Sequence, residues 1–204
     1  MLNRSRQWIL TSMAGLLLTV FNVPVASAAE LEAPPAAVPS FDRQELIDKL
    51  DVKDKDVIGL YYTSMEGSPE NRVHNIKKAV KKINGEKLKP GEYFSFNQEV
   101  GNSNLAEDGW KEANVIVDGQ LTEGYGGGIC QVSSTLFNAV QEAQLPIQER
   151  HSHSKSVGYV PVGQDATIAY GLLDFRFSNP FAHTLKIKAK TYNDSDVVIA
   201  ILKK

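Results

Sequence analysis

The chain has 204 residues, of which 42% are hydrophobic and 23% are charged, and its formal net charge is −2. This length is enough for one domain with a hydrophobic core of its own. A weakly acidic chain lacks the basic surface on which nucleic acids and other anionic polymers bind, so we expect no nucleic-acid partner. The single cysteine excludes an intramolecular disulfide and leaves a buried thiol, a thiol paired with another molecule or a free reactive thiol.

The first 28 residues have the pattern of a secretory signal peptide. Arg4 and Arg6 precede an apolar run that extends from Trp8 to about residue 25, and the small residues at 26–28 suit cleavage after Ala28. Residues 29–40 are rich in alanine and proline, as linkers often are, so the sequence predicts a single domain at 41–204. We therefore expect a secreted protein at the extracellular face of the cell envelope. Contact with the membrane would occur only through the signal peptide, if it is not cleaved.

Periodicity and turn residues predict the elements that follow in chain order. Helical spacing of apolar residues predicts a helix at 41–50, a second helix between Ser68-Pro69 and Asn84-Gly85, and a third at about 130–143. Runs of β-branched and aromatic residues predict strands at 56–64, 93–97, 114–124 (a hairpin around Asp118-Gly119), 147–153, 156–160, 166–177, 184–192 and 196–202. Helices in the first two thirds and strands in the last third predict an α+β fold with a mainly antiparallel sheet. It has two principal helices, one of which starts at the Gly-rich loop and Cys130.

The stretch EGYGGGICQ (123–131) places four glycines directly before the only cysteine. At a helix start, the helix dipole and the unpaired backbone amides favour negative charge, which would stabilise the thiolate form of Cys130. The same amides could hold the oxyanion that forms during acyl transfer to a cysteine nucleophile. Two alternatives stay open: Cys130 is a small buried apolar residue, or the glycine loop binds a phosphate or a carboxylate.

The segment ERHSHS (149–154) offers partners for a thiolate, because His151 and His153 on a strand would project to the same face. Asp165 is the first choice for the carboxylate that orients the imidazole, and Asp174 is the second. Each of these residues taken alone is more typical of an ordinary surface position. One cysteine, two histidines and an aspartate could also bind zinc, but their spacing matches no closed structural site. We therefore predict no metal and no cofactor.

Six motifs occur in order along most of the chain, and GGGICQVS is the most specific part of them. They are NRVHNI (71–76), KPGEYFSFN (89–97), GGGICQVSSTL (126–136), ERHSHS (149–154), YVPVGQDAT (159–167) and LLDFRFSN (172–179). Together they resemble the VanW-type domain, a family named for an accessory protein of vancomycin-resistance clusters, over about residues 57–200. The resemblance implies an exported cell-envelope protein from a bacterium, most often of the Gram-positive type. The family's second histidine falls on His153, which is therefore preferred to His151.

The resulting hypothesis is a secreted protein that acts on or binds peptidoglycan or its peptide stems. Cys130 would be the nucleophile of an acyl transferase or amidohydrolase, with His153 as the base and Asp165 as the orienting carboxylate. Candidate substrate-binding residues are Gly126, Gly127, Gly128, Gln131, Arg150 and Arg176, since glycine amides suit an oxyanion and arginine suits a carboxylate. The alternative is a non-catalytic peptidoglycan- or peptide-binding accessory protein linked to glycopeptide resistance. The sequence leaves open whether the protein is an enzyme.

Overall fold

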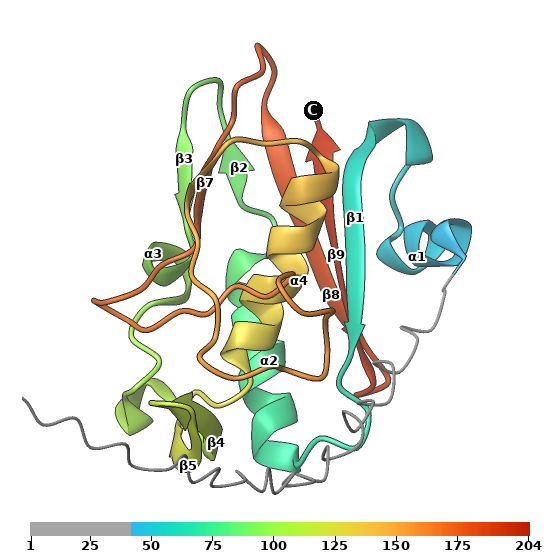
Figure 1. Cartoon of the computed structure of the whole chain (residues 1–204). Coiled ribbons are helices and arrows are strands. Elements are labelled where there is room, and N and C mark those ends of the chain that lie inside the picture. The colour runs from blue at the N-terminus through green and yellow to red at the C-terminus, as the bar shows by residue number, and fades with distance from the viewer. Residues whose placement is uncertain (1–41) are drawn as a thin grey trace, which may run out of the picture. The chain divides into compact units, whose positions relative to one another are not determined.

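The computed structural model describes residues 42–204, so the predicted signal peptide (1–28) and linker (29–40) lie outside the described residues. A four-stranded antiparallel sheet forms the centre of this part of the chain, with the strand order β1-β9-β8-β2 (Figure 1). Its strands are β1 (Val57–Ser64), β2 (Lys87–Leu88), β8 (Leu185–Tyr192) and β9 (Asp196–Lys203). All the described residues belong to a single compact unit.

Helices cover both faces of this sheet (Figure 1). On one face lie α2 (Glu70–Ile83) and α4 (Ile129–Glu142), and on the other lies α1 (Arg43–Leu50). The central strand β9 is therefore apolar at nearly every position: Val197, Ile199 and Ile201 belong to the cluster with α2 and α4. Their neighbours Val198, Ala200 and Leu202 pack with α1. Each large side chain buried in this way contributes about 1.5–3 kcal/mol.

The remaining elements form a smaller sheet, a hairpin and short helical turns. A three-stranded antiparallel sheet has the order β3-β7-β6, and a separate hairpin is formed by β4 and β5. The bounds are β3 (Tyr93–Ser95), α3 (Phe96–Val100), β4 (Glu112–Val117), β5 (Gln120–Tyr125), β6 (Ile147–Glu149) and β7 (Arg176–Ser178), with 3-10 turns η1 (Asp54–Asp56) and η2 (Ala106–Asp108). Within residues 42–204, no helix has the length and apolar character needed to cross a membrane.

The α+β fold is confirmed, and so are the elements that local turn chemistry predicted. The β4–β5 hairpin turns at Asp118 and Gly119, whose φ angles of 50° and 76° are those of a two-residue hairpin turn. The β8–β9 turn contains Asn193 and Asp194, which also have positive φ. Asparagine, aspartate and glycine tolerate this left-handed region better than other residues do.

The strand predicted at 156–160 is wrong, the one predicted at 166–177 is reduced to its end in β7 (Arg176–Ser178), and the one predicted at 147–153 ends at Glu149. Residues 150–174, here called the site segment, run as loops with two isolated bridges, His151 to Thr167 and Ala169 to Leu173. The physical reason is that side chains, rather than a neighbouring strand, satisfy much of this backbone. The strand predicted at 93–97 also ends early, because Ser95 caps α3 by accepting a hydrogen bond from the amide of Gln98.

Candidate active site

Cys130 is the second residue of α4 and carries a free thiol, and the residue as a whole is partly buried. Its Sγ atom lies 3.7 Å from the hydroxyl oxygen of Thr167 and 3.7 Å from the carbonyl oxygen of Ile168. Both contacts come from the site segment, which therefore passes directly over the start of the helix. The position at the first turn is the one in which helix amides and the helix dipole favour a thiolate.

The three glycines before α4 fit its first turn closely against other parts of the fold. A Cβ atom on Gly127 would lie 2.7 Å from the backbone of Ala113 in β4. One on Gly128 would lie 2.8 Å from Cγ of Arg72 in α2, and φ of Gly128 is 105°. Gly126 meets the loop at Ser103 in the same way, at 2.8 Å. The predicted substrate-binding glycines thus have protein atoms as neighbours, and only glycine permits this approach.

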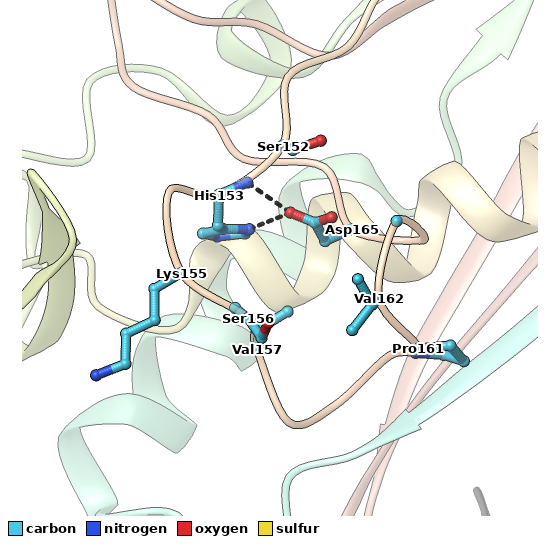
Figure 2. Close-up of a pocket in the computed structure, with 9 residues that line it drawn as sticks. Ser152, His153, Lys155, Ser156, Val157, Pro161, Val162 and Asp165 are labelled. Carbon is cyan, nitrogen blue, oxygen red and sulfur yellow. Dashed lines mark hydrogen bonds and ion pairs between the residues drawn. The ribbon is translucent and has the colours of Figure 1, made fainter. Parts of the chain in front are cut away.

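His153 and Asp165 form a buried pair beside the thiol, with 6% and 10% of their side chains exposed. Figure 2 shows that one carboxylate oxygen of Asp165 accepts two hydrogen bonds from His153, from its backbone amide and from Nδ1, both at 2.6 Å. The other carboxylate oxygen accepts from Arg150 at 3.1 Å. Because Nδ1 faces Asp165, Nε2 is the ring nitrogen left for a partner on the other side of the imidazole.

The His153–Asp165 pair and the Cys130 thiol shift one another's pKa values. Burial by itself would raise the pKa of Cys130, but a hydrogen bond to His153, its charge, and contacts with Ile168 and Thr167 lower it overall. Burial would likewise lower the pKa of His153, and interactions with Cys130 and Asp165 raise it instead. The two opposite shifts favour a thiolate–imidazolium pair. Asp165 has a lowered pKa because its hydrogen bonds to His153 outweigh its burial.

Polar side chains on α4 fix the backbone that carries Asp165. The amide of Ala166 donates to Oγ of Ser134 at 2.9 Å, and the side-chain amide of Asn138 donates to the carbonyl of Gln164 at 2.7 Å. Both α4 residues are buried. The helix that presents the cysteine therefore also positions the carboxylate, so that the two are held in one rigid unit.

His151 has a different environment from the one that a continuous strand would give it. Because β6 ends at Glu149, His151 and His153 do not share a face, and the ring of His151 contacts the Glu149 carboxylate at 2.9 Å. Only its backbone approaches the site, since its carbonyl accepts a hydrogen bond from the amide of Thr167. Asp174, the second choice for the orienting carboxylate, instead accepts from Ser95.

The other predicted binding residues have structural partners. The Gln131 side chain is buried and donates to Thr63 and to the carbonyl of Ser64. Arg150 donates to the carbonyl and the carboxylate of Asp165, at 2.6 and 3.1 Å. Arg176 is exposed on β7, where it pairs in register with Glu149 and not with the thiol.

Two residues that the sequence analysis assigned no role, Arg72 and Tyr159, also lie at the site. The Tyr159 ring is 6.5 Å from the ring of His153 and 6.0 Å from the guanidinium carbon of Arg72. Burial, and then the negative charge of Cys130, raise the pKa of Tyr159. The available signal was their position in the motifs NRVHNI and YVPVGQDAT, although neither pattern indicates a thiol neighbour by itself.

Two cavities adjoin these residues. The loop cavity, of about 170 Å³, is shown in Figure 2 and is lined by Ser152, His153, Lys155, Ser156, Val157, Pro161, Val162, Gly163 and Asp165. The hairpin cavity, of about 320 Å³, is lined by Pro69, Glu70, Asn71, Arg72, Glu112, Ala113, Asn114 and Glu123. Only the second reaches the size of typical small-ligand sites, about 300–1,000 Å³. Among residues 42–204, no group of three or more His, Cys, Asp or Glu side chains could hold a metal ion.

Comparisons with known proteins agree with the motifs. The family model described as VanW like protein matches residues 71–202. The chain is 49% identical over 141 residues to the Bacillus subtilis (strain 168) protein named Uncharacterized protein YoaR, covering 69% of this chain and 46% of that protein. It is 34% identical over 134 residues to Vancomycin B-type resistance protein VanW of Enterococcus faecalis (strain ATCC 700802 / V583), covering 63% of this chain and 48% of that protein.

The chain thus spans about half the length of the curated relatives it matches. No solved structure matches it significantly. The matched family region contains Arg72, the glycine loop, Cys130, His153 and Asp165, so the whole candidate site lies inside it. On the strength of a match across most of its described residues, the chain belongs to the VanW-like protein family.

Proposed function

We propose that this protein is a secreted cell-envelope enzyme that transfers or hydrolyses acyl groups on the peptide stems of peptidoglycan. The single observation that carries the reaction is the Cys130–His153–Asp165 arrangement, with a lowered thiol pKa and a raised imidazole pKa. The peptidoglycan substrate is supported by the relative named for vancomycin resistance, because vancomycin acts on the cell wall. Export is supported by the signal-peptide pattern of residues 1–28.

The geometry supports a reaction in two steps, acylation of the thiol and then deacylation. The Cys130 thiolate attacks the carbonyl carbon of a peptide amide, and an S–C bond forms while the carbonyl oxygen becomes an oxyanion. The C–N bond then breaks, and His153 gives its proton to the departing amine, leaving a thioester. In the second step, water or an acceptor amine attacks the thioester carbon while His153 takes a proton. The S–C bond breaks and the thiolate is restored.

The first turn of α4 supplies a candidate oxyanion donor. The amides of Ile129 and Gln131 donate to the carbonyls of Gly126 and Gly128, at 3.2 and 3.0 Å. We therefore assign the amide of Cys130, between them, to the oxyanion. A preorganised backbone donor of this kind typically contributes about 3 kcal/mol to transition-state stabilisation. Asp165 holds the His153 ring through Nδ1, which leaves Nε2 for proton transfer with the thiol.

The test is to incubate the purified chain with soluble peptidoglycan fragments and to examine both partners by mass spectrometry. We expect trimmed or exchanged peptide stems, together with a covalent adduct on Cys130 that hydroxylamine removes, because hydroxylamine cleaves thioesters. Cys130→Ser is the matched control, since it keeps the size of the side chain and removes thiolate chemistry.

Two results would overturn the proposal. One is a set of fragments that stay unchanged and leave no adduct. The other is a Cys130→Ser variant that retains full function in cells. If the fragments bind to the wild type and to Cys130→Ser equally, without turnover, the protein is the non-catalytic binding accessory that the sequence also allows.

A further inference from the structure

Arg72 is a partly buried cation without an acidic partner among the described residues. Its two terminal nitrogens donate to neutral oxygens, those of Ser68 at 2.8 Å and of the Gln131 side chain at 2.7 Å. These bonds use two of the five guanidinium N–H groups and hold the side chain in place. A guanidinium fixed in this way, with donors to spare and no counterion, suits a carboxylate ligand.

Arg72 also lies beside the candidate nucleophile. It donates to the side chain of Gln131, the residue directly after Cys130, and its Cγ atom would touch a Cβ on Gly128. Burial lowers the pKa of Arg72, while interactions with Tyr159 and Cys130 act in the opposite direction. A carboxylate bound at Arg72 would therefore be part of the same substrate molecule that reacts at the thiol.

Among the described residues that line the hairpin cavity, Arg72 is the only positive side chain, and three are carboxylates, those of Glu70, Glu112 and Glu123. The register of the β4–β5 hairpin explains part of this lining. Glu112 and Asn114 alternate onto one face of β4, and Glu123 is the direct cross-strand partner of Asn114, so all three share that face. The side chain of Asn71 ties the start of α2 to this strand by donating to the carbonyl of Glu112 at 2.9 Å.

The charges of this cavity select against a purely anionic ligand, which would meet three carboxylates. A purely cationic ligand would be attracted by the carboxylates but would leave Arg72 without a counterion. A ligand with both charges satisfies the two sets at once, as close opposite charges attract strongly in a partly buried site.

Building on the proposed function, we propose that the hairpin cavity binds a zwitterionic peptide segment. Its free carboxylate lies on Arg72 and its ammonium group on Glu112 and Glu123. The substrate is then a short peptide with a free carboxylate close to the bond that Cys130 attacks and with an unblocked amine. A diamino acid followed by a C-terminal residue has both groups. The size of the cavity, about 320 Å³, lies within the range of small-ligand sites.

The binding test uses the purified Cys130→Ser chain, so that no reaction intervenes. The probe is Nα-acetyl-Lys-Ala, followed by NMR titration of the backbone amides. Its C-terminal amide lacks the carboxylate, and its Nε-acetyl derivative lacks the ammonium group. We expect each blocked peptide to bind at least about tenfold more weakly than the probe, because each loses one charge-assisted contact.

Charge variants assign the two contacts. Arg72→Gln should abolish the preference for acid over amide, and Arg72→Lys should keep part of it. The double variant Glu112→Gln, Glu123→Gln should abolish only the preference for the free lysine amine. Arg43→Gln on α1 and Glu107→Gln on η2 are matched controls, since both side chains are exposed and neither lines the cavity. Thermal unfolding of each variant checks that it is folded.

A second measurement places the carboxylate site beside the thiol. Iodoacetate carries a carboxylate next to its reactive carbon, whereas iodoacetamide has the same carbon and no charge. The ratio of their rate constants at Cys130 cancels the thiolate fraction, and we expect Arg72→Gln to lower it about fivefold or more, while Arg43→Gln leaves it unchanged.

Equal binding of the acid and the amide, or an alkylation ratio that Arg72→Gln does not move, would overturn the zwitterion site. If the proposed function is wrong but the zwitterion site is right, the experiments give a different result. In that case the probe still binds with both preferences, and peptidoglycan fragments remain uncleaved by the wild-type chain.

Discussion

Two histidine–carboxylate pairs lie close together in this chain. They consist of the same kinds of side chain but differ in burial and in their neighbours. His153 and Asp165 have side chains that are 6% and 10% exposed, and their pair adjoins the Cys130 thiol. His151 and Glu149 are 39% and 31% exposed, and their pair forms at the end of β6. The comparison teaches that burial and contact with the thiol, rather than residue type or spacing, distinguish these two pairs.

The comparison is tested most strongly by the reactivity of the thiol. His153→Ala should slow the alkylation of Cys130 by iodoacetamide at pH 6.5 by up to about 100-fold, because a thiol with an ordinary pKa of about 8.5 is only about 1% ionised at that pH. His151→Ala should change the rate by less than about twofold, since only its backbone contacts the site. The measurement is the rate of alkylation from pH 5 to 9.

Equal rates for the two alanine variants would show that the surface and buried pairs do not differ toward the thiol. A wild-type thiol that reacts only after unfolding would identify Cys130 as a packing residue.

The free energy of unfolding should also distinguish the buried pair from the surface pair. Asp165→Ala removes the acceptor of hydrogen bonds from His153 and Arg150, so we expect the free energy of unfolding to fall by about 2–4 kcal/mol. Glu149→Ala removes a carboxylate that is about one-third exposed and should cost about 1 kcal/mol or less. Urea unfolding monitored by circular dichroism measures both. Comparable losses would mean that the buried pair is not an anchor of the site segment.

The pH dependence of stability should have a definite sign. The pKa of Asp165 is lowered on folding, so its stabilisation is complete above the unfolded value of about 3.9 and is lost as the pH falls through the folded value. The pKa of His153 is raised, so its stabilisation is complete below about 6.5 and is lost as the pH rises through the folded value. The pair therefore stabilises the fold most between about pH 4 and 6.5.

Asp165→Asn checks this sign in a conservative way. The difference in unfolding free energy between the wild type and this variant should be largest at about pH 5–6 and should shrink as the pH falls below 4. Urea titrations at several pH values supply the curve. A difference that grows on acidification would contradict the assignment of Asp165 as the ionised partner.

The parts of the fold that depend on local chemistry were predictable from the sequence. The Asp118-Gly119 turn, the start of α4 after the glycine loop and the apolar strand β9 each follow from residues that are neighbours along the chain. The resemblance to the VanW-type domain favours His153 over His151, and Asp165 is the first choice for the carboxylate; the structure brings these two side chains into contact. Local sequence patterns predict helices and strands well where the backbone hydrogen bonds are formed within those elements.

The site segment could not be predicted for the converse reason. Its backbone is held by Ser134 and Asn138 on α4, which lie 32 and 26 residues from their partners. Its alternating apolar residues imitate a strand, yet no neighbouring strand pairs with them over 156–160. The position of Arg72 at the site was not predicted for the same reason, because its hydrogen bond to Gln131 joins residues that are 59 positions apart in the sequence. Contacts of this range leave no periodic pattern in a single sequence.

Salt concentration should have the smallest effect, and it should weaken only the coupling between Glu149 and His151. Double-mutant cycles for Glu149 with His151 at pH 6 should give a coupling of a few tenths of a kcal/mol at 50 mM salt, as is usual for exposed ion pairs. At 0.5 M salt this coupling should approach zero, because the screening length falls to a few ångströms. The coupling of Asp165 with His153 should persist, since water and ions reach that pair poorly. Equal salt sensitivity in the two cycles would mean that the His153 pair is hydrated in solution, and a hydrated imidazolium would stabilise the Cys130 thiolate much less.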